Sequence, residues 1–402
     1  MDIKITRLGH LGDGIAEGPL FAPRTLPGEV VSGTPKGDRL TDIRIVTPSE
    51  HRVKAPCAHY NACGGCALQH ASDDFVAGWK RQVIQTALAA QDLSVTAEPT
   101  LTSPAGTRRR GTLHGKRTKK GALVGFHARA AETITPVPNC MLLDPVILAA
   151  IPTLENLTRI AASRAAEVAY HLTVSDAGLD LAIENAKPLD ASIRQELPSY
   201  VAAFARVTLN GESVLQAAAP GVRFGTARVV PPPGAFLQAT PEGETALVRA
   251  AMDAIGPATR VIDLFSGCGT FTFPAAAQAA VHAMESEQTL LDALDHGVRH
   301  NQGLKPITTE RRDLFRNPVL PEDLTKFDAA IIDPPRAGAE AQVAELAQSS
   351  IPRIAFVSCN PVTFAREAAT LVQAGYTLNW VRVIDQFRWS PHIETVASFS
   401  KD

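Results

Sequence analysis

The sequence lacks any long apolar run. No stretch reaches the roughly 18 apolar residues that would span a membrane, and residues 1–7 lack the apolar core of a signal peptide. We therefore expect a cytoplasmic protein with no membrane partner. The chain has 402 residues. That length is too great for one ordinary hydrophobic core, so two or three domains are expected.

The sequence also has little net charge. A formal net charge of −2 gives no overall attraction to nucleic acid. The segment 106–129 nevertheless contains no acidic residue and holds these basic ones: Arg108, Arg109, Arg110, Lys116, Arg117, Lys119, Lys120 and Arg129. Such a patch can neutralise several phosphates at contact range, although a solvated hairpin with basic ends would have the same composition. We expect Arg108 to Arg110 to hold backbone phosphates.

A disulfide framework is not expected, because cytosolic chains seldom build one. Cys57, Cys63 and Cys66 lie close together, and Cys140 stands alone further along the chain. Close cysteine spacing in such a protein indicates a metal site or cysteine chemistry. Four thiolates suit zinc, which is the more frequent outcome of this spacing, and they also suit a [4Fe–4S] cluster.

Three regions of the chain differ in patterning, and no internal repeat is apparent. Residues 1–54 carry short alternating strands between glycine-rich turns, which predicts a small OB-like β-barrel. Residues 55–235 are expected to form a central RNA-binding region that begins with the cysteine loop. From about 103 to 235, strand-like pieces alternate with alanine-rich ones, which predicts an α+β insertion. Residues 72–91 of the central region have helical periodicity, and we expect this helix to pack on the C-terminal domain. Residues 236–402 alternate apolar strand runs with helix-length segments, which predicts an α/β, Rossmann-like domain.

Polar residues follow successive strands of that predicted sheet, where open α/β sheets bind their ligands. Gly267 and Gly269 follow the first strand and allow close backbone approach to a ligand. The turn lacks the Lys-Ser/Thr ending of a phosphate-binding loop. Glu285 closes the second strand, where a carboxylate can accept hydrogen bonds from ribose hydroxyls, and Asp313 stands where a third would end. The pattern indicates a nucleoside site, with S-adenosylmethionine and NAD both open.

A cysteine ends the fifth predicted strand. Cys359 follows an apolar run at the ligand edge of the sheet, where packing explains a thiol poorly; a buried structural cysteine is the alternative. The fourth strand ends in Asp333-Pro334-Pro335, a stiff turn that suits a loop holding a planar base. His392 and Glu394 are expected on one side of a strand near the C-terminus.

These motifs resemble those of the RNA (uracil-5)-methyltransferases, in particular the enzymes that modify 23S ribosomal RNA. The resemblance spans nearly the whole chain. It is carried by Cys57-x5-Cys63-Gly-Gly-Cys66, Phe236-Leu-Gln238, residues 263–269, Asp333-Pro-Pro-Arg336-Ala-Gly338, Ser358-Cys-Asn-Pro361 and His392-Ile-Glu394. The N-terminal barrel resembles the RNA-binding TRAM domain found in many members.

The resemblance implies a class I methyltransferase domain that transfers a methyl group from S-adenosylmethionine to C5 of a uridine in RNA. It implies Cys359 as the nucleophile and Glu394 as the general base. It also implies a cofactor site lined by Gln238, Phe265, Thr270, Glu285, Asp313 and Asp333. The cysteines implied to hold a [4Fe–4S] cluster are Cys57, Cys63, Cys66 and Cys140. We expect 23S rRNA as the substrate, with tRNA as the alternative, and a monomeric enzyme.

Phe236 is our candidate for stacking on a uridine that leaves its own stack. Cys268, in the glycine-rich turn, is a less plausible nucleophile than Cys359. Two other functions compete with this interpretation. A cytosine-5 methyltransferase also uses a cysteine thiolate, but the sequences around Asp333 and Cys359 argue against it. A non-catalytic RNA-binding or assembly protein would need neither Cys359 nor Glu394.

Overall fold

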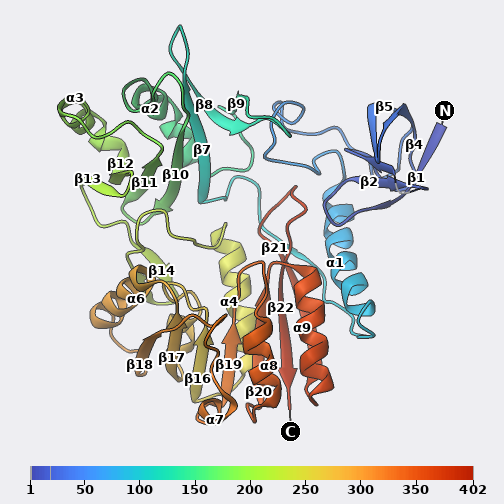
Figure 1. Cartoon of the computed structure of the whole chain (residues 1–402), viewed down its shortest axis with the longest axis vertical. Helices are drawn as coiled ribbons and strands as arrows, with labels where there is room; N and C mark the ends of the chain where they lie inside the picture. Colours follow the sequence, from blue (N-terminus) through green and yellow to red (C-terminus); the bar gives the residue numbers. More distant parts are fainter. Residues whose placement is uncertain (1, 19, 402) are drawn as a thin grey trace.

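The computed structural model describes residues 2–18 and 20–401. Residues 1 and 402, the predicted outer limits of the first and last regions, lie outside the described residues. Figure 1 shows the three regions in different parts of the molecule, with the barrel and the central region both above the C-terminal domain and on opposite sides. Of the described residues, none forms a helix long and apolar enough to cross a membrane.

The N-terminal region is a closed barrel, in agreement with the prediction. Its strands are β1 (Asp2–Leu8), β2 (Gly14–Ala16), β3 (Leu20–Ala22), β4 (Val30–Lys36) and β5 (Arg39–Thr47), in the order β1-β2-β3-β5-β4. Small and branched side chains such as Ile5, Ala22 and Val31 fill its interior. Gly14 is required there, since a Cβ at this position would lie 2.1 Å from Thr25 Oγ1.

The central region is a seven-stranded sheet in the order β13-β12-β11-β10-β7-β8-β9. The strands are β7 (Arg110–Arg117), β8 (Ala122–His127), β9 (Ile134–Pro136), β10 (Val168–Ser175), β11 (Gly178–Glu184), β12 (Phe204–Leu209) and β13 (Glu212–Gln216). Helix α2 (Pro145–Ala161) packs on one face, with α3 (Ala191–Glu196) and a 3-10 turn (Leu197–Ala203) beside it. The hairpin β14 (Val222–Phe224) and β15 (Ala227–Val229) leads on to the C-terminal domain.

The C-terminal domain is built on an eight-stranded sheet in the order β18-β17-β16-β19-β20-β22-β21-β6. Strands β16 (Arg260–Leu264), β17 (Ala280–Glu285), β18 (Ile307–Arg311), β19 (Ala329–Ile332) and β20 (Arg353–Ser358) are parallel, and β22 (Glu394–Ser400) runs antiparallel to β20 and to β21 (Thr377–Asp385). The helices are α4 (Pro241–Ile255), α5 (Thr272–Ala275), α6 (Gln288–His300), α7 (Pro321–Leu324), α8 (Glu340–Gln348) and α9 (Pro361–Gln373). The predicted Rossmann-like architecture is confirmed.

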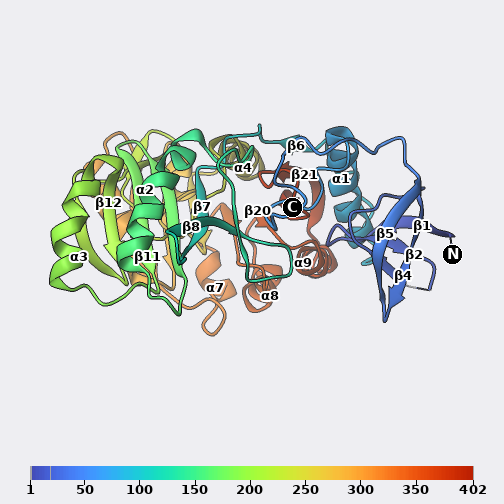
Figure 2. The ribbon, with the colours of Figure 1, turned by 90° about the horizontal axis from the view of Figure 1, so that it is seen from above.

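One helix joins the barrel to the C-terminal sheet. Helix α1 (Asp73–Ala89) matches the helix predicted over 72–91, and Ser72 caps it by accepting a hydrogen bond from the Phe75 amide. Its residues Ile84 and Leu88 are fully buried in the core beneath α9 and β21. The following strand, β6 (Leu101–Thr102), adds to the edge of the same sheet beside β21. Figure 2 shows the barrel beyond α1, at one end of the molecule.

Candidate active site

A pocket of about 590 Å³ lies at the carboxyl ends of β19 and β20. The cysteine loop, the central region and the C-terminal domain all contribute to its wall: Gly64, Gly65, Ala67, Arg108, Phe126, Leu142, Phe236, Arg336, Cys359, Phe387, Arg388, Ser390, Pro391, His392 and Glu394. The position agrees with the rule that open α/β sheets bind ligands at the carboxyl ends of their strands. Cys359 and Glu394, from separate segments of the chain, thus line one cavity.

Backbone pairing holds these two residues beside each other. Cys359 directly follows β20, and Ser358 pairs with Thr395 across to β22, so Glu394 begins the neighbouring strand. The next residue, Asn360, fixes the turn: its Oδ1 accepts from the Val362 amide over 3.1 Å, and its Nδ2 donates to the Arg336 carbonyl over 2.9 Å. Cys359 therefore sits between a buried strand and a capped helix, on a rigid support.

The predicted strand does not extend to His392. β22 begins at Glu394, and His392 lies in the loop before it, where its carbonyl accepts a hydrogen bond from Lys80 over 2.8 Å. The two side chains still line the same pocket. The alternating pattern of the sequence continues through this loop, but the backbone there bonds to a lysine side chain rather than to a neighbouring strand.

Burial raises the pKa of the acidic groups at this edge of the sheet in the free protein. It raises the pKa of Cys359 to about 12, and the nearby Glu394 and Asp333 carboxylates push in the same direction, while Arg336 opposes them. Burial, then the Asp333 charge, raises the pKa of Glu394 to about 8. Burial also raises the pKa of Asp333 to about 7. A cation or a proton acceptor that enters the pocket would favour the ionised forms.

Lys80 and Gln386 hold segments that line or adjoin this pocket. Neither residue is marked by a local pattern in the sequence. The ammonium of Lys80, on α1, is fully buried and lies 2.6 Å from Asp385 Oδ1. Gln386 accepts a hydrogen bond from the Ala239 amide and donates to Gln238 Oε1, both over 2.6 Å. The Gln238 segment and the loop after β21 are thus fastened to each other.

Two of the proposed cofactor residues lie at neighbouring strand ends. Phe265 follows β16 with φ +63°, a strained value for a bulky residue. Its ring lies 5.4 Å from the ring of the half-exposed Phe315. Glu285 ends β17 and accepts hydrogen bonds from the amides of Gly267 and Ser286.

Two further candidates lie in the loops of the same edge. Asp313, shortly after β18, accepts a hydrogen bond from the Phe315 amide and remains partly exposed. Thr270 follows Gly269, whose φ of +103° and close contact with Phe273 leave no space for a Cβ. Two aromatic faces and carboxylates on adjacent strand ends fit an adenosine moiety. Phe315 was not predicted as a site residue, because its only signal in the sequence is its place two residues after Asp313.

The three consecutive arginines do not share one role. Arg109 is buried, forms an ion pair with Glu244 and donates from Nε to the Gln238 carbonyl over 3.1 Å. The prediction that it holds a phosphate is therefore wrong, because its charge is already paired inside the protein. The guanidinium of Arg110 lies 4.3 Å from the centre of the exposed Phe236 ring, and that of Arg108 lies 5.4 Å from Phe387.

The four cysteines line one small cavity together with Tyr60, Phe126 and Leu142. Burial raises the pKa of Cys66 to about 12, and the other three thiols add to that effect. Among the described residues, no three of their sulfurs lie within 4.8 Å of one another. Tetrahedral zinc, with Zn–S bonds of ~2.3 Å, would hold its sulfurs ~3.8 Å apart. Four thiolates can also hold the implied [4Fe–4S] cluster, so this donor set suits either group.

The comparisons with known proteins find RNA methyltransferases. Residues 232–401 match the family model described as tRNA (Uracil-5-)-methyltransferase. An uncharacterized RNA methyltransferase of Rhizobium meliloti is 42% identical over 99% of both chains. The 23S rRNA (uracil(1939)-C(5))-methyltransferase of Vibrio cholerae is 31% identical over 99% of this chain and 95% of its own. A solved structure, the Pyrococcus abyssi tRNA (uracil-54, C5)-methyltransferase with S-adenosyl-L-homocysteine, has a TM-score of 0.77 over 99% of both chains at 22% identity.

Proposed function

The chain belongs to the RNA (uracil-5)-methyltransferase family and is an S-adenosylmethionine-dependent RNA uracil-C5 methyltransferase, and from this premise we propose that it methylates a uridine of 23S rRNA through a covalent adduct at Cys359. The observation that carries the proposal is the shared pocket, which brings the thiol of Cys359 and the carboxyl of Glu394 to one cavity at the ligand edge of the sheet.

The residue types match the difficulty of the reaction. C5 of uracil is a weak nucleophile, and addition of the Cys359 thiolate to C6 converts the ring to an enolate whose C5 is reactive. S-adenosylmethionine supplies the methyl group that C5 takes up. Glu394, as a carboxylate, then removes the proton left on C5. The electron pair of that C–H bond restores the C5–C6 double bond and expels the Cys359 thiolate.

The surrounding residues would position the two substrates. The exposed ring of Phe236, with Arg110 over one face, offers a surface on which an extruded base can stack. Gln238, Phe265, Thr270, Glu285, Asp313 and Asp333 would line the cofactor site. Cys57, Cys63, Cys66 and Cys140 would hold a structural [4Fe–4S] cluster. The barrel would act as a TRAM-like RNA-binding module.

The choice of 23S rRNA rests on sequence similarity over whole chains. The relative from Vibrio cholerae, whose name states a 23S rRNA uracil, is 31% identical across nearly its full length. The tRNA enzyme of known structure is only 22% identical, so that likeness supports the fold alone. A tRNA substrate is the second candidate, because the description of the matching family model names tRNA.

Covalent trapping would test nucleophile and substrate together. The wild-type protein would be incubated with labelled S-adenosylmethionine and either 23S RNA or tRNA containing 5-fluorouridine, then examined by denaturing mass spectrometry and peptide mapping. Fluorine cannot leave C5 as a proton does, so we expect a stable, methylated adduct at Cys359 with 23S RNA. Cys359→Ala should bind the RNA and form no adduct.

Each outcome has a separate meaning. An adduct with tRNA alone would reject the proposed substrate and keep the mechanism. An adduct at Cys268, or methyl transfer by Cys359→Ala, would reject Cys359 as the nucleophile. Intact RNA binding with no methyl transfer to either RNA by wild-type protein would reject both candidate substrates.

A further inference from the structure

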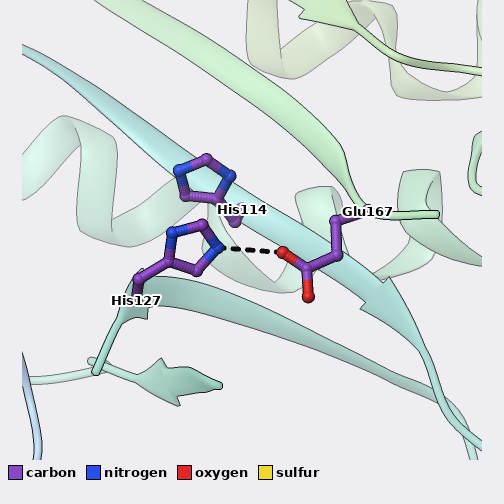
Figure 3. Close-up of side chains that lie close together, drawn as sticks. All are labelled: His114, His127 and Glu167. Carbon is purple, nitrogen blue, oxygen red and sulfur yellow. Dashed lines mark hydrogen bonds and ion pairs between the residues drawn. The ribbon is translucent and has the colours of Figure 1, made fainter. Parts of the chain in front are cut away.

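A group of side chains that could hold a metal ion lies in the central sheet, outside the cysteine cavity. His114 on β7, His127 at the end of β8 and Glu167 just before β10 each offer a ligand atom, and these atoms all lie within 4.8 Å of one another. Figure 3 shows the two imidazoles stacked, with Glu167 beside them. Their ring centroids are 3.8 Å apart. The residues are only partly buried, so an ion can reach them from solvent.

The sheet itself fixes the spacing of these ligands. β7 pairs with β8, placing His114 opposite Gly125, and with β10, placing Gly115 opposite Val168. The three ligands therefore come from adjacent positions on a rigid scaffold, as precise metal sites require. Sequence spacing does not reveal the group, because its members are separated by 13 and 40 residues and match no metal-binding motif.

We propose that His114, His127 and Glu167 bind a divalent transition-metal ion of the zinc type. Two imidazoles and one carboxylate form a ligand set that zinc favours, with water completing a four-coordinate shell. Binding would turn the rings out of their stacked arrangement, since each nitrogen lone pair lies in the plane of its ring. The ion would displace the proton with which His127 Nε2 now donates to Glu167 Oε2 over 2.9 Å.

The ion pair between Lys116 and Glu167 does not explain why His114 and His127 lie beside this carboxylate. Lys116 Nζ lies 3.0 Å from Glu167 Oε1, but this lysine is half exposed, and ion pairs in contact with solvent contribute little. Lys116 can move away from Glu167 when an ion is bound by the three ligands. Among the residues that the structure describes, no hydrogen bond involves the His114 ring, which stacks on the His127 ring. Coordination would give that ring a polar partner.

The site adjoins the joint between the three regions of the molecule. The carbonyl of His127 accepts a hydrogen bond from the amide of Gly64, in the cysteine loop, over 2.9 Å. Two residues further, Arg129 donates to Asp13 of the barrel over 2.8 Å. An ion on His127 would therefore hold the end of β8 where the central sheet meets both the cysteine loop and the barrel.

Zinc binding to the full-length protein would test this site. After treatment with a mild chelator, wild type, His127→Ala and Glu167→Gln would be equilibrated with Zn²⁺, and bound zinc counted per chain. X-ray absorption would give the ligand type, because nitrogen and oxygen ligands lie at ~2.0–2.1 Å and sulfur at ~2.3 Å from zinc. His282→Ala is the matched control: His282 Nε2 faces Glu310 at 3.3 Å without a second histidine in that pair.

We expect wild type and His282→Ala to bind one more nitrogen- and oxygen-ligated zinc than either site variant. The stacked pair His296 and His300 is present in all four proteins, so any zinc bound there cancels in the comparison. Equal zinc content in all four proteins would overturn the proposal, as would sulfur-only coordination in wild type. Glu167→Gln preserves the size of the side chain and one of its two acceptor oxygens, so it remains informative if His127→Ala fails to fold.

Discussion

At the scale of single residues, the edge of the sheet at the active-site pocket gathers acidic groups whose pKa values are raised in the free protein. Cys359, Glu394 and Asp333 share a poorly solvated edge of the sheet, and each ionised carboxylate opposes ionisation of the thiol. A methyl donor with a positive sulfonium would reverse this balance, because a nearby cation favours ionised acids. Thiolate formation would thereby depend on occupancy of the cofactor site.

The raised pKa of Glu394 predicts how the stability of the free protein depends on pH. Its pKa is about 8 in the folded state, against an ordinary value of 4.5 for a solvated glutamate. The folded state therefore binds more protons than the unfolded state between these values, and stability falls as pH rises from about 5 to 8. Glu394→Gln should remove part of this slope and be more stable than wild type above pH 8, by ~2–4 kcal/mol.

Urea unfolding of both proteins at several pH values would measure this difference. Well below the ordinary glutamate pKa both side chains are neutral in both states, so the two proteins should have similar stability there. Asp333, with a pKa of about 7, titrates in the same range in both proteins and leaves a residual slope. Equal slopes for wild type and Glu394→Gln would mean that Glu394 is ionised throughout.

Two exposed phenylalanines should separate RNA binding from cofactor binding. Phe236 stacks with Arg110 beside the pocket, whereas Phe315 contacts Phe265 at the cofactor edge. Loss of one base-stacking contact costs ~1–3 kcal/mol. Phe236→Leu should therefore weaken RNA binding about 5- to 150-fold and change the affinity for S-adenosylmethionine little. Phe315→Leu should weaken the binding of S-adenosylmethionine and change the affinity for RNA little. Fluorescence titration and calorimetry would measure both; identical effects of the two variants would contradict the assignment.

The predictability of these residues depended on how local their signals are. The strand-end positions of Glu285, Asp313 and Asp333 were predictable because each lies at or shortly after the carboxyl end of a strand with a local sequence pattern, while their part in cofactor binding stays a prediction. Arg109 was misjudged since its partner Glu244 lies 135 residues away, and only the fold brings the pair together. His114 and His127 were missed because neighbouring strands, rather than sequence spacing, bring them into contact.

At the scale of elements, helix α1 acts as a clamp on the catalytic edge. It buries Lys80 against the end of β21, where the ammonium contacts Asp385 and donates to the carbonyls of Phe387 and His392. These bonds fix the loop between β21 and β22, whose residues line the active-site pocket. The partners are separated by more than 300 residues, so no sequence pattern could reveal them, although the helix itself was predictable from its periodicity.

Removal of the buried ammonium should therefore affect both stability and catalysis. Lys80→Met would leave the Asp385 carboxylate buried and unpaired, which costs ~3–5 kcal/mol. The released loop should also raise KM for RNA and lower kcat. Lys326→Met is the matched control, because its pair with Asp323 is exposed and should contribute less than ~1 kcal/mol. Equal stability losses in the two variants, measured by urea unfolding, would exclude the clamp.

At the scale of the whole molecule, the loop that carries the first three cysteines contacts every region. The Tyr60 carbonyl accepts from Arg24 of the barrel over 2.8 Å, and the Gly64 amide donates to His127 of the central sheet. The amides of Ala67 and Leu68 both donate to the Trp389 carbonyl in the loop between β21 and β22. The loop spans 57–70 without helix or strand, so cysteine ligation would supply much of its order.

Cys140 should consequently matter for the assembly of the protein rather than for the methyl-transfer step. It comes from the central region, whereas the other three ligands come from the loop, so a cluster bound by all four would tie the two together. Cys140→Ala should contain less iron and give less soluble protein. Cys268→Ala, which removes a buried thiol outside the cavity, should keep its iron. Iron analysis and soluble yield of both variants would measure this; normal folding and full iron content in Cys140→Ala would show that the cluster, if bound, does not depend on the fourth thiol.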